Sequence, residues 1–197
     1  AAKVPLVGVN MGKLGYLACV AKENLERDTK RILSGEFLPL ERCIIEATFP
    51  DGAKHHALND VVIKSADFRL AELKVRVDDE FVTEYSCDGL IFATATGSTA
   101  YNLSAGGPIL HQGAKGVVMT PICAHTLTNR SVLFDPASVL TVEGGQTNVH
   151  INIDGRATAM GRSCMPIKIQ ACTHSLVTLE DPKRGHFATL RQKLNWK

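Results

Sequence analysis

From residue 41 to residue 179, the chain is a close succession of short apolar, β-branched runs separated by turn-forming residues. In ELKVRVD, the apolar residues Leu73, Val75 and Val77 alternate with charged ones, the pattern of a strand with one buried face. The acidic residues 78–80 then turn the chain into FVTEY, which predicts a β-hairpin. Further short runs follow: GVVMT, SVLF, SVLTV, NVHINID, PIKIQA and SLVTL. So many strands at close spacing predict an all-β sandwich or barrel.

The two ends of the chain have a different pattern. Residues 24–34 predict a helix, with Gly35 as its C-terminal cap. Its apolar face is formed by Leu25, Ile32 and Leu33. A short amphipathic helix is predicted at the C-terminus, where three apolar residues have helical spacing: Phe187, Leu190 and Leu194. Residues 4–10 predict an apolar strand with no element ahead of it, so we expect the start of a larger protein to be missing.

The composition narrows the function classes. At 197 residues, the chain is long enough for one large domain, or a domain and a half, with a sizeable core. A formal net charge of +2 gives no electrostatic case for nucleic acid or an anionic membrane. The longest apolar runs fall far short of a membrane span, and we see no signal peptide. We therefore expect a cytoplasmic protein that binds neither nucleic acid nor membrane.

The six cysteines are scattered and form no Cys-x-x-Cys pair. This predicts reduced thiols rather than a disulfide scaffold. We expect no zinc site, because no His or Cys pair has ligand spacing. His55 and His56 are adjacent and would point apart in a strand, so we interpret them as a solvated turn before a strand.

The stretch DGLIFATATGSTAYNLSAGGP, residues 88–108, is the most informative for function. Asp88 precedes the apolar run 90–93, which predicts a buried strand. The loop 96–104 that follows is rich in hydroxyl groups and free backbone N–H groups, and it carries Tyr101. This combination suits a small polar ligand with a flat base, such as a nucleotide.

Two more polar segments accompany this stretch: Asn59–Asp60 ahead of an apolar strand, and 154–156 (Asp-Gly-Arg) after another. Taken singly, each of these two is better explained as an ordinary turn, because such side chains bond nearby backbone. Together they could serve a ligand: the amide and the carboxylate can clamp a ribose diol, and Tyr101 can stack on a base. The alternatives are a core aromatic for Tyr101 and a solvated surface charge for Arg69.

The segments LNDVVI, DGLIFATATGSTAYNLSAGGPIL and TPICAHTLTNRSVLF, in this order, closely resemble the NAD kinases. GVNMGKLGYLA near the start and FATLRQKLNW at the end do so too, and the resemblance covers essentially the whole chain. It implies an ATP-dependent phosphorylation of the adenosine ribose 2′-hydroxyl of NAD, giving NADP, with Mg²⁺ or another divalent cation accompanying ATP. The implied fold is α+β overall and mainly β: a C-terminal sandwich-like domain plus a remnant of an N-terminal α/β domain.

The resemblance also implies a set of NAD-binding residues. Asn59 and Asp60 match the pair that holds ribose hydroxyls, Asp88 matches the acid before the apolar strand, and the loop from Thr96 matches the adenine contacts. The full set is Tyr16, Asn59, Asp60, Arg69, Asp88, Thr96, Thr99, Ala100, Tyr101, Asn102, Leu103, Ser104 and Asp154. A further family signature matches Pro121, His125 and Arg130, which we interpret as mainly structural. For His125 we favour a buried, hydrogen-bonded histidine over a catalytic one.

Two departures from the family pattern matter. The family's Gly-Gly-Asp-Gly loop, whose acid takes the proton from the attacking hydroxyl, would lie upstream of Ala1. We therefore assign no catalytic residue in this chain and expect it to be inactive on its own. Asp60 stands where most members have Glu, which withdraws the carboxylate by about 1.5 Å. A misplacement on the order of 1 Å can lower a rate about a hundredfold.

The resemblance divides the chain into residues 1–20 of the N-terminal domain, a β-rich NAD-binding domain at 21–182, and a helix at 183–197 that returns to the N-terminal domain. It implies a homodimer or homotetramer with the NAD site near a subunit contact, and leaves polyphosphate open as a second donor. Two alternatives remain: a related diacylglycerol- or sphingosine-type lipid kinase, and a non-catalytic dinucleotide-binding module.

Overall fold

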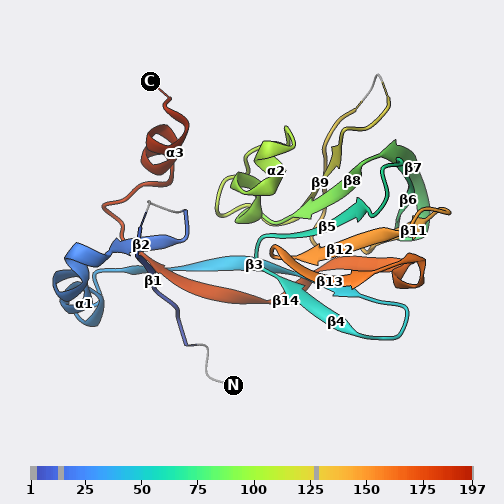
Figure 1. The fold of residues 1–197 in the computed structure, drawn as a ribbon. Coiled ribbons are helices and arrows are strands. Elements are labelled where there is room, and N and C mark those ends of the chain that lie inside the picture. The colour runs from blue at the N-terminus through green and yellow to red at the C-terminus, as the bar shows by residue number, and fades with distance from the viewer. Residues whose placement is uncertain (1–3, 13–15, 127–128, 197) are drawn as a thin grey trace. The chain divides into compact units, whose positions relative to one another are not determined.

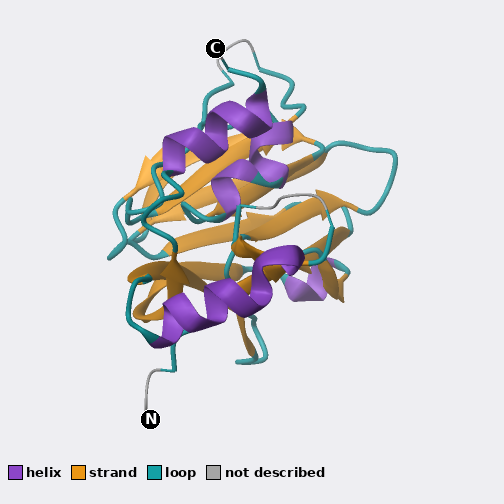
Figure 2. Cartoon of the chain, turned by 90° about the vertical axis from the view of Figure 1, so that its left-hand side faces the viewer, coloured by secondary structure: helices purple, strands orange, loops and turns teal. Residues whose placement is uncertain are grey.

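The computed structural model describes residues 4–12, 16–126 and 129–196, which divide between two compact units. Unit 1 comprises residues 1–42, 111–113 and 175–197, and unit 2 comprises residues 43–110 and 114–174. The described chain contains far more strand than helix (Figure 2).

Unit 2 is built from two six-stranded antiparallel sheets (Figure 1). Sheet 1 has the order β10 (Val132–Phe134), β9 (Val117–Ile122), β8 (Gly89–Ala93), β5 (Asp60–Ser65), β12 (Val149–Ile153) and β13 (Arg156–Met160). Sheet 2 has the order β4 (Lys54–Ala57), β3 (Leu38–Thr48), β14 (Ile167–Glu180), β11 (Leu140–Gly144), β6 (Ala71–Val77) and β7 (Glu80–Cys87). The predicted β-sandwich is confirmed. Strands β3 and β14 contribute residues to both units.

The main core of unit 2 lies between the inner faces of the two sheets. Alternate residues of each strand point into it, as the period of two requires. Fully buried members include Val61, Ile63, Leu90, Phe92, Leu73, Val75, Ile167 and Ile169. The ELKVRVD pattern thus predicted the buried face of β6 correctly.

The central strands of sheet 1 are buried on their outer face as well. Val62, Ile91 and Val118 form a second apolar cluster there, against which Ala105 and Leu110 pack. The covering chain follows helix α2 (Tyr101–Ser104) and the single 3₁₀ turn η2 (Gly97–Thr99). Burial on both faces explains why β8 is a continuous apolar run rather than an alternating one.

Two hairpins of unit 2 are closed by two-residue turns in which both residues have positive φ. Asp78 and Asp79, at φ 49° and 68°, join β6 to β7, which confirms the predicted hairpin. Asp154 and Gly155, at φ 48° and 74°, join β12 to β13. Such turns match the twist of the strands and favour Asp, Asn and Gly.

Two sequence interpretations of sheet 2 are wrong. His55 and His56 are not a turn, because the chain has already reversed at Gly52 (φ 85°) and both histidines lie in β4, paired with β3. PIKIQA and SLVTL are not separate strands either. The polar residues 172–174 between them resemble a turn, but they continue β14 on an exposed part of the sheet.

Unit 1 contains a short parallel pair, β1 (Gly8–Asn10) and β2 (Ala18–Ala21), with η1 (Lys22–Asn24), α1 (Leu25–Leu33) and α3 (His186–Leu194). Its small core is formed by Cys19, Val20 and Phe37, with Val7, Ile32 and Leu179 packed against them. Both predicted helices are present, and Gly35 follows α1 at φ 80°. Leu33, however, is 82% exposed and Ile32 is only partly buried, so α1 does not bury the whole predicted face. The predicted boundaries at residues 20 and 182 stay a prediction.

All six cysteines are free thiols, as predicted. No helix in the described part of the chain is long and apolar enough to span a membrane.

Candidate functional site

A hollow of about 500 Å³ lies on the outer face of sheet 1 in unit 2. Its floor is the outward-facing side of β5, namely Asp60, Val62 and Lys64, which are two residues apart. The remaining lining residues come from three other places: Asn59, Asn152 of β12, Ala100 and Tyr101, and the turn residues Asp154 and Gly155.

The strand register brings the three polar segments to this one place. Asp60 at the start of β5 pairs with Ala93 at the end of β8, and Val61 pairs with Ile153 at the end of β12. The loop after β8 and the turn after β12 therefore emerge at the edge where β5 begins. Three segments that each resemble ordinary turns in the sequence converge on one hollow.

The Asp154 carboxylate is hydrogen-bonded by the backbone of the neighbouring segment. Its Oδ2 accepts the N–H of Leu58 at 2.8 Å, and its Oδ1 accepts those of Asn59 at 2.7 Å and Asp60 at 3.1 Å. The N–H of Asp154 donates in return to the carbonyl of Asp60 at 3.0 Å. Charge-assisted bonds of this kind are stronger than neutral ones. Asp154 therefore fixes the backbone that presents Asn59 and Asp60.

The Asp60 carboxylate is the opposite case. The residue is 5% exposed, and within the described residues its carboxylate has no hydrogen-bond partner. Burial, and then the charge of Asp154, raise the pKa of Asp60 to about 6. A buried acceptor that lines a hollow and has no protein donor is suited to a donor group on a ligand.

The loop after β8 is held tightly against the Asn59 segment. The Thr94 hydroxyl donates to the carbonyl of Leu58 at 2.5 Å and accepts the N–H of Gly97 at 3.2 Å. The N–H of Thr94 donates to the carbonyl of Asn59 at 2.9 Å. A Cβ on Gly97 would lie 2.0 Å from that same carbonyl oxygen, so only glycine fits here.

The Asn102 side chain is buried and fully engaged within the protein. Its amide donates to the carbonyls of Ser98 at 3.1 Å and Pro108 at 3.0 Å, and its Oδ1 accepts the hydroxyl of Thr120 at 2.7 Å. Asn102 therefore fixes the position of α2. No atom of its side chain is left for a ligand, because each of its hydrogen-bonding groups already has a protein partner.

Tyr101 begins α2 and is 38% exposed. The Nζ of Lys64 lies 5.9 Å from the centre of its ring. The alternative of a core aromatic is therefore wrong: the ring borders the hollow with a cation beside it. Lys64 is not among the residues predicted from the sequence, although its spacing from Asp60 and Val62 along one strand indicates that it shares their face.

The hollow gathers only part of the predicted set. Asn59, Asp60, Ala100, Tyr101 and Asp154 line it. Five further predicted residues lie in the same loop but do not line it: Thr96, Thr99, Asn102, Leu103 and Ser104. Thr96 is buried, and its carbonyl accepts the Thr99 hydroxyl at 3.4 Å.

Asp88 and Arg69 lie at the other end of β8. Asp88 is five residues before Ala93, which corresponds to about 17 Å along a strand. Its carbonyl accepts the N–H of Ser65 at 2.9 Å, and the Ser65 hydroxyl donates to the carbonyl of Arg69 at 2.6 Å. The side chains of Asp88 and Arg69 are exposed, so this end forms a second polar surface, separate from the hollow.

His125 lies beside this second surface, and the interpretation as a buried histidine is wrong. It is exposed, and its backbone N–H donates to the carbonyl of Ser86 at 2.9 Å. The reason is that β9 ends at Ile122 and the chain turns outward at Cys123, which has φ 48°. Pro121 is buried within β9, and Arg130 is exposed.

Tyr16 belongs to unit 1. Its hydroxyl is buried without a hydrogen-bond partner in the described residues, and burial raises its pKa. The Nζ of Lys193 lies 5.8 Å from the centre of its ring.

The hollow offers few ligands for a magnesium ion. Mg²⁺ in proteins is usually held by one or two carboxylates, substrate phosphates and waters. The Asp154 carboxylate already accepts hydrogen bonds from three backbone N–H groups. Among the described lining residues, only Asp60 has a carboxylate that accepts no hydrogen bond. The hollow therefore does not form a magnesium cage by itself.

Comparison with known proteins gives one consistent result. A family model described as the ATP-NAD kinase C-terminal domain matches residues 58–180. Curated NAD kinases from Syntrophobacter fumaroxidans and Solibacter usitatus are 38% and 40% identical to the chain over 201 residues. These matches cover 98% of this chain and 71% and 70% of theirs.

Two solved structures are similar over nearly the whole chain. Yeast NADH kinase complexed with NADH has a TM-score of 0.92 at 25% identity, covering 99% of this chain and 60% of that one. An NAD kinase from Archaeoglobus fulgidus in complex with ATP has a TM-score of 0.82 at 25% identity, covering 98% of this chain and 74% of that one. The chain thus spans less than two thirds of the length of the yeast enzyme.

Proposed function

The chain belongs to the NAD kinase family, and we propose that it supplies the NAD-binding half of an enzyme that phosphorylates the adenosine ribose 2′-hydroxyl of NAD. The observation that carries this proposal is the hollow itself. Three polar segments from different parts of the chain meet there around a buried carboxylate that has no hydrogen-bond donor among the described residues.

Each lining residue has a role that its chemistry supports. Asp60 accepts hydrogen bonds from the ribose diol, and the Asn59 amide can donate or accept beside it. Tyr101 stacks on the adenine, an interaction that tolerates a partly exposed ring. Lys64 adds a positive charge for the pyrophosphate. Asp154 acts through the backbone of Asn59 and Asp60 as a positioning residue.

Asn102, Thr96 and Thr99 support the same site by shaping the loop, and we expect Leu103 and Ser104 to do so from α2. Asp88, Arg69 and Tyr16 we propose as outlying contacts. Asp88 and Arg69 lie away from the hollow within unit 2, which fits the expected homodimer or homotetramer, in which the NAD site lies near a subunit contact. ATP, with polyphosphate as a second possible donor, and Mg²⁺ or another divalent cation complete the reaction in the cytoplasm.

The chemical step needs groups beyond those assigned in this chain. We propose that the general base comes from a Gly-Gly-Asp-Gly loop of the kind that the resemblance implies. The residues that line the hollow bind NAD, orient the ribose and hold its 2′-hydroxyl in place. Positioning and electrostatic stabilisation are most of what phosphoryl transfer requires from a protein. We therefore expect the chain alone to bind NAD without turning it over.

Calorimetry on the 197-residue chain tests this proposal, with NAD and with an NAD analogue that lacks the 2′-hydroxyl of the adenosine ribose as the two ligands. NAD should bind one-to-one, and the deoxy analogue more weakly, because it leaves the Asp60 carboxylate without its donor. In Asp60→Ala, which removes the acceptor, the two ligands should bind alike. No binding of NAD, or a deoxy penalty that persists in the variant, would refute the assignment. Measurable NADP formation by the chain with ATP and Mg²⁺ would instead show that the base lies within it.

A further inference from the structure

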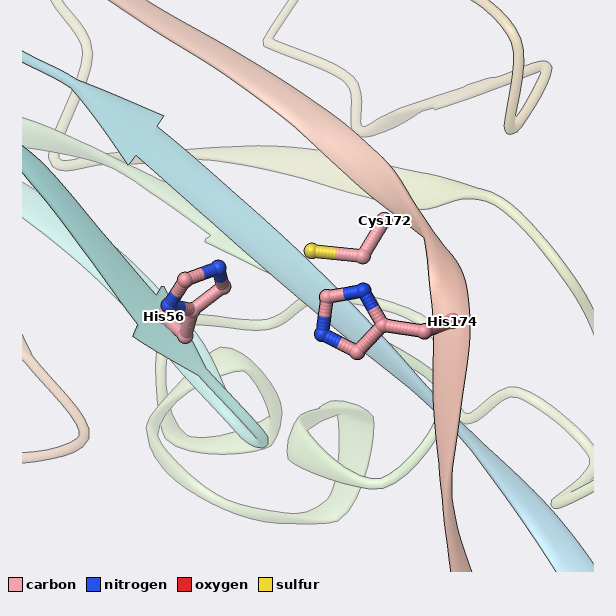
Figure 3. Close-up of side chains that lie close together, drawn as sticks. All are labelled: His56, Cys172 and His174. Atoms are coloured by element: carbon pink, nitrogen blue, oxygen red, sulfur yellow. The ribbon is translucent and has the colours of Figure 1, made fainter. Parts of the chain in front are cut away.

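Three potential metal ligands meet on sheet 2 of unit 2, outside the hollow described above. His56 lies on β4, and Cys172 and His174 lie on β14. One ligand atom from each residue lies within 4.8 Å of the other two. In Figure 3 the two imidazole rings and the sulfur atom are turned toward a common space in front of β3.

The sheet order explains this meeting. Strand β3 lies between β4 and β14, so side chains from the two outer strands approach one another across it. Cys172 and His174 are two residues apart on one strand and therefore share a face. Their strand borders a hollow of about 650 Å³, lined also by Glu46, Lys54 and Gln170, with room for water or a further ligand.

Glu46 on β3 orients this cluster. It pairs directly with His56 in the sheet, and its Oε2 lies 3.3 Å from the Nε2 of His56. Its other oxygen, Oε1, accepts a hydrogen bond from the Nζ of Lys54 at 2.8 Å. A carboxylate that accepts the second ring N–H of a metal-bound histidine is a common outer partner in metal sites.

We propose that His56, Cys172 and His174 form a binding site for a divalent cation of the Zn²⁺ class. Two imidazole nitrogens and one thiolate are the ligands that Zn²⁺ prefers, whereas Mg²⁺ and Ca²⁺ prefer oxygen. As the metal–sulfur bond forms, the S–H bond of Cys172 breaks and its proton passes to solvent. The fourth position is taken by water.

Such a site would tie the edge strand β4 to β14 across β3. His56 and His174 are exposed and Cys172 is partly exposed, so an ion can enter from solvent. The site involves none of the residues that line the hollow on sheet 1. Its test therefore needs neither NAD nor kinase activity, and its failure would leave the proposed function untouched.

Co²⁺ is a suitable probe, because a tetrahedral Co²⁺ site with a thiolate ligand absorbs strongly. We expect the reduced, chelator-treated chain to bind one equivalent of Co²⁺ with a sulfur-to-cobalt charge-transfer band. One equivalent of Zn²⁺ should abolish the band, because nitrogen and sulfur sites bind Zn²⁺ more tightly than Co²⁺. Cys172→Ser should lack the band, whereas Cys123→Ser, which removes an exposed thiol elsewhere, should keep it.

The histidines and Glu46 give a graded second test. We expect His56→Ala and His174→Ala each to weaken Co²⁺ binding at least about tenfold, and Glu46→Gln by roughly 10–100-fold if it orients His56. His55→Ala is the matched control, because His55 is the neighbour of His56 on β4 and packs against Phe49 instead. It should bind Co²⁺ normally.

The outcomes are decisive in either direction. A band that survives in Cys172→Ser, a band lost equally in Cys123→Ser, or no stoichiometric binding would overturn the site. If Cys172→Ser fails to fold, thermal melting of the unaltered chain decides. A rise in Tm with Zn²⁺ that is absent with Mg²⁺ and absent from His174→Ala supports the proposal, and no rise refutes it.

Discussion

The hollow on sheet 1 and the His56–Cys172–His174 cluster on sheet 2 both gather residues from separate strands, but they are held in different ways. The hollow's walls are fixed before any ligand arrives, by the three N–H bonds to Asp154 and by the buried Thr94. The cluster's side chains stand on the faces of their strands and are largely exposed. A preformed site loses little freedom on binding, whereas the cluster gains its order from the ion.

This difference predicts how the two regions respond to substitution. Changes in the hollow's scaffold should lower both stability and NAD affinity and leave metal binding intact. Changes in the cluster should abolish metal binding and leave the hollow intact.

The largest effect is expected for Gly97→Ala. The added Cβ would lie 2.0 Å from the Asn59 carbonyl oxygen, and hydrogen bonds hold the backbone of both Asn59 and Gly97 in place. We expect a loss of about 1–3 kcal/mol in the free energy of unfolding, as for overpacked sites. NAD affinity should fall at least about tenfold, since tenfold corresponds to about 1.4 kcal/mol.

Denaturant titration and calorimetry measure these two quantities, and Co²⁺ binding by the same variant should be unchanged. Gly12→Ala is the control, because a Cβ there meets nothing within 4 Å. Normal NAD affinity in Gly97→Ala would mean that the hollow is not preformed.

The sequence reveals the hollow more readily than the cluster because of where the residues lie on their strands. Asn59–Asp60, the loop from Thr96 and Asp154 all lie at strand ends, where polar residues interrupt apolar runs and stand out. Lys64 and Asn152 lie within strands and line the hollow only through the register of β5 with its neighbours. Register depends on long-range pairing, which a single sequence does not show.

The metal cluster is not predicted from the sequence for the same reason, because it depends on the order of strands in the sheet. Cys172 and His174 have the spacing of two that places both on one face of a strand, but the sequence predicts separate strands for the runs PIKIQA and SLVTL on either side of them. His56 reaches them only because β3 lies between β4 and β14. The alternation of β6 and the apolar run of β8, in contrast, depend on local burial alone and were predicted correctly.

The second-largest effect is expected for Asp154→Ala. The variant loses an acceptor of three N–H bonds and places alanine at φ 48°. We expect a loss of roughly 1–3 kcal/mol in the free energy of unfolding and an NAD affinity reduced by about tenfold or more.

Asp79→Ala separates the two causes of this loss of stability, which are the missing hydrogen bonds and the positive φ of the alanine. Asp79 also has positive φ in a two-residue turn, at 68°, but no hydrogen bond of its side chain is present among the described residues. It should lose only the backbone contribution, on the order of 1 kcal/mol, and bind NAD normally. Equal losses in the two variants would show that Asp154 does not position the Asn59–Asp60 segment.

Tyr101→Ala should change affinity without changing stability. The ring is 38% exposed, so its removal uncovers little of the core. Stacking of a base on an aromatic ring is worth about 1–3 kcal/mol by alanine substitution, which corresponds to a loss of roughly 5–150-fold in NAD affinity. Phe81→Ala, at an exposed ring on β7, is the control and should bind NAD normally. A less stable Tyr101 variant with unchanged affinity would restore the interpretation of a packing residue.

The smallest effect is a pH dependence carried by Asp60. Its pKa is raised from 3.8 to about 6, so the folded chain binds this proton more tightly than the unfolded chain. The resulting stability is fully present below about pH 4 and is lost as the pH rises through about 6. We expect Asp60→Asn to remove this change, which is on the order of 1–2 kcal/mol after solvent screening. Urea unfolding of both proteins at pH 4.5 and 7 measures it, because the difference between them cancels other titrating groups.

NAD binding should follow the opposite course. Above pH 6 the ionised Asp60 accepts hydrogen bonds from the ribose, and below it the protonated acid loses one acceptor. NAD affinity should therefore fall as the pH is lowered through 6, and this fall should be absent in Asp60→Asn. An affinity independent of pH in the unaltered chain would mean that the carboxylate faces no ligand donor. The affinity of the hollow for NAD would then come from Tyr101 and Lys64. The hollow and the metal cluster would then differ only in how rigidly each is held before its ligand binds.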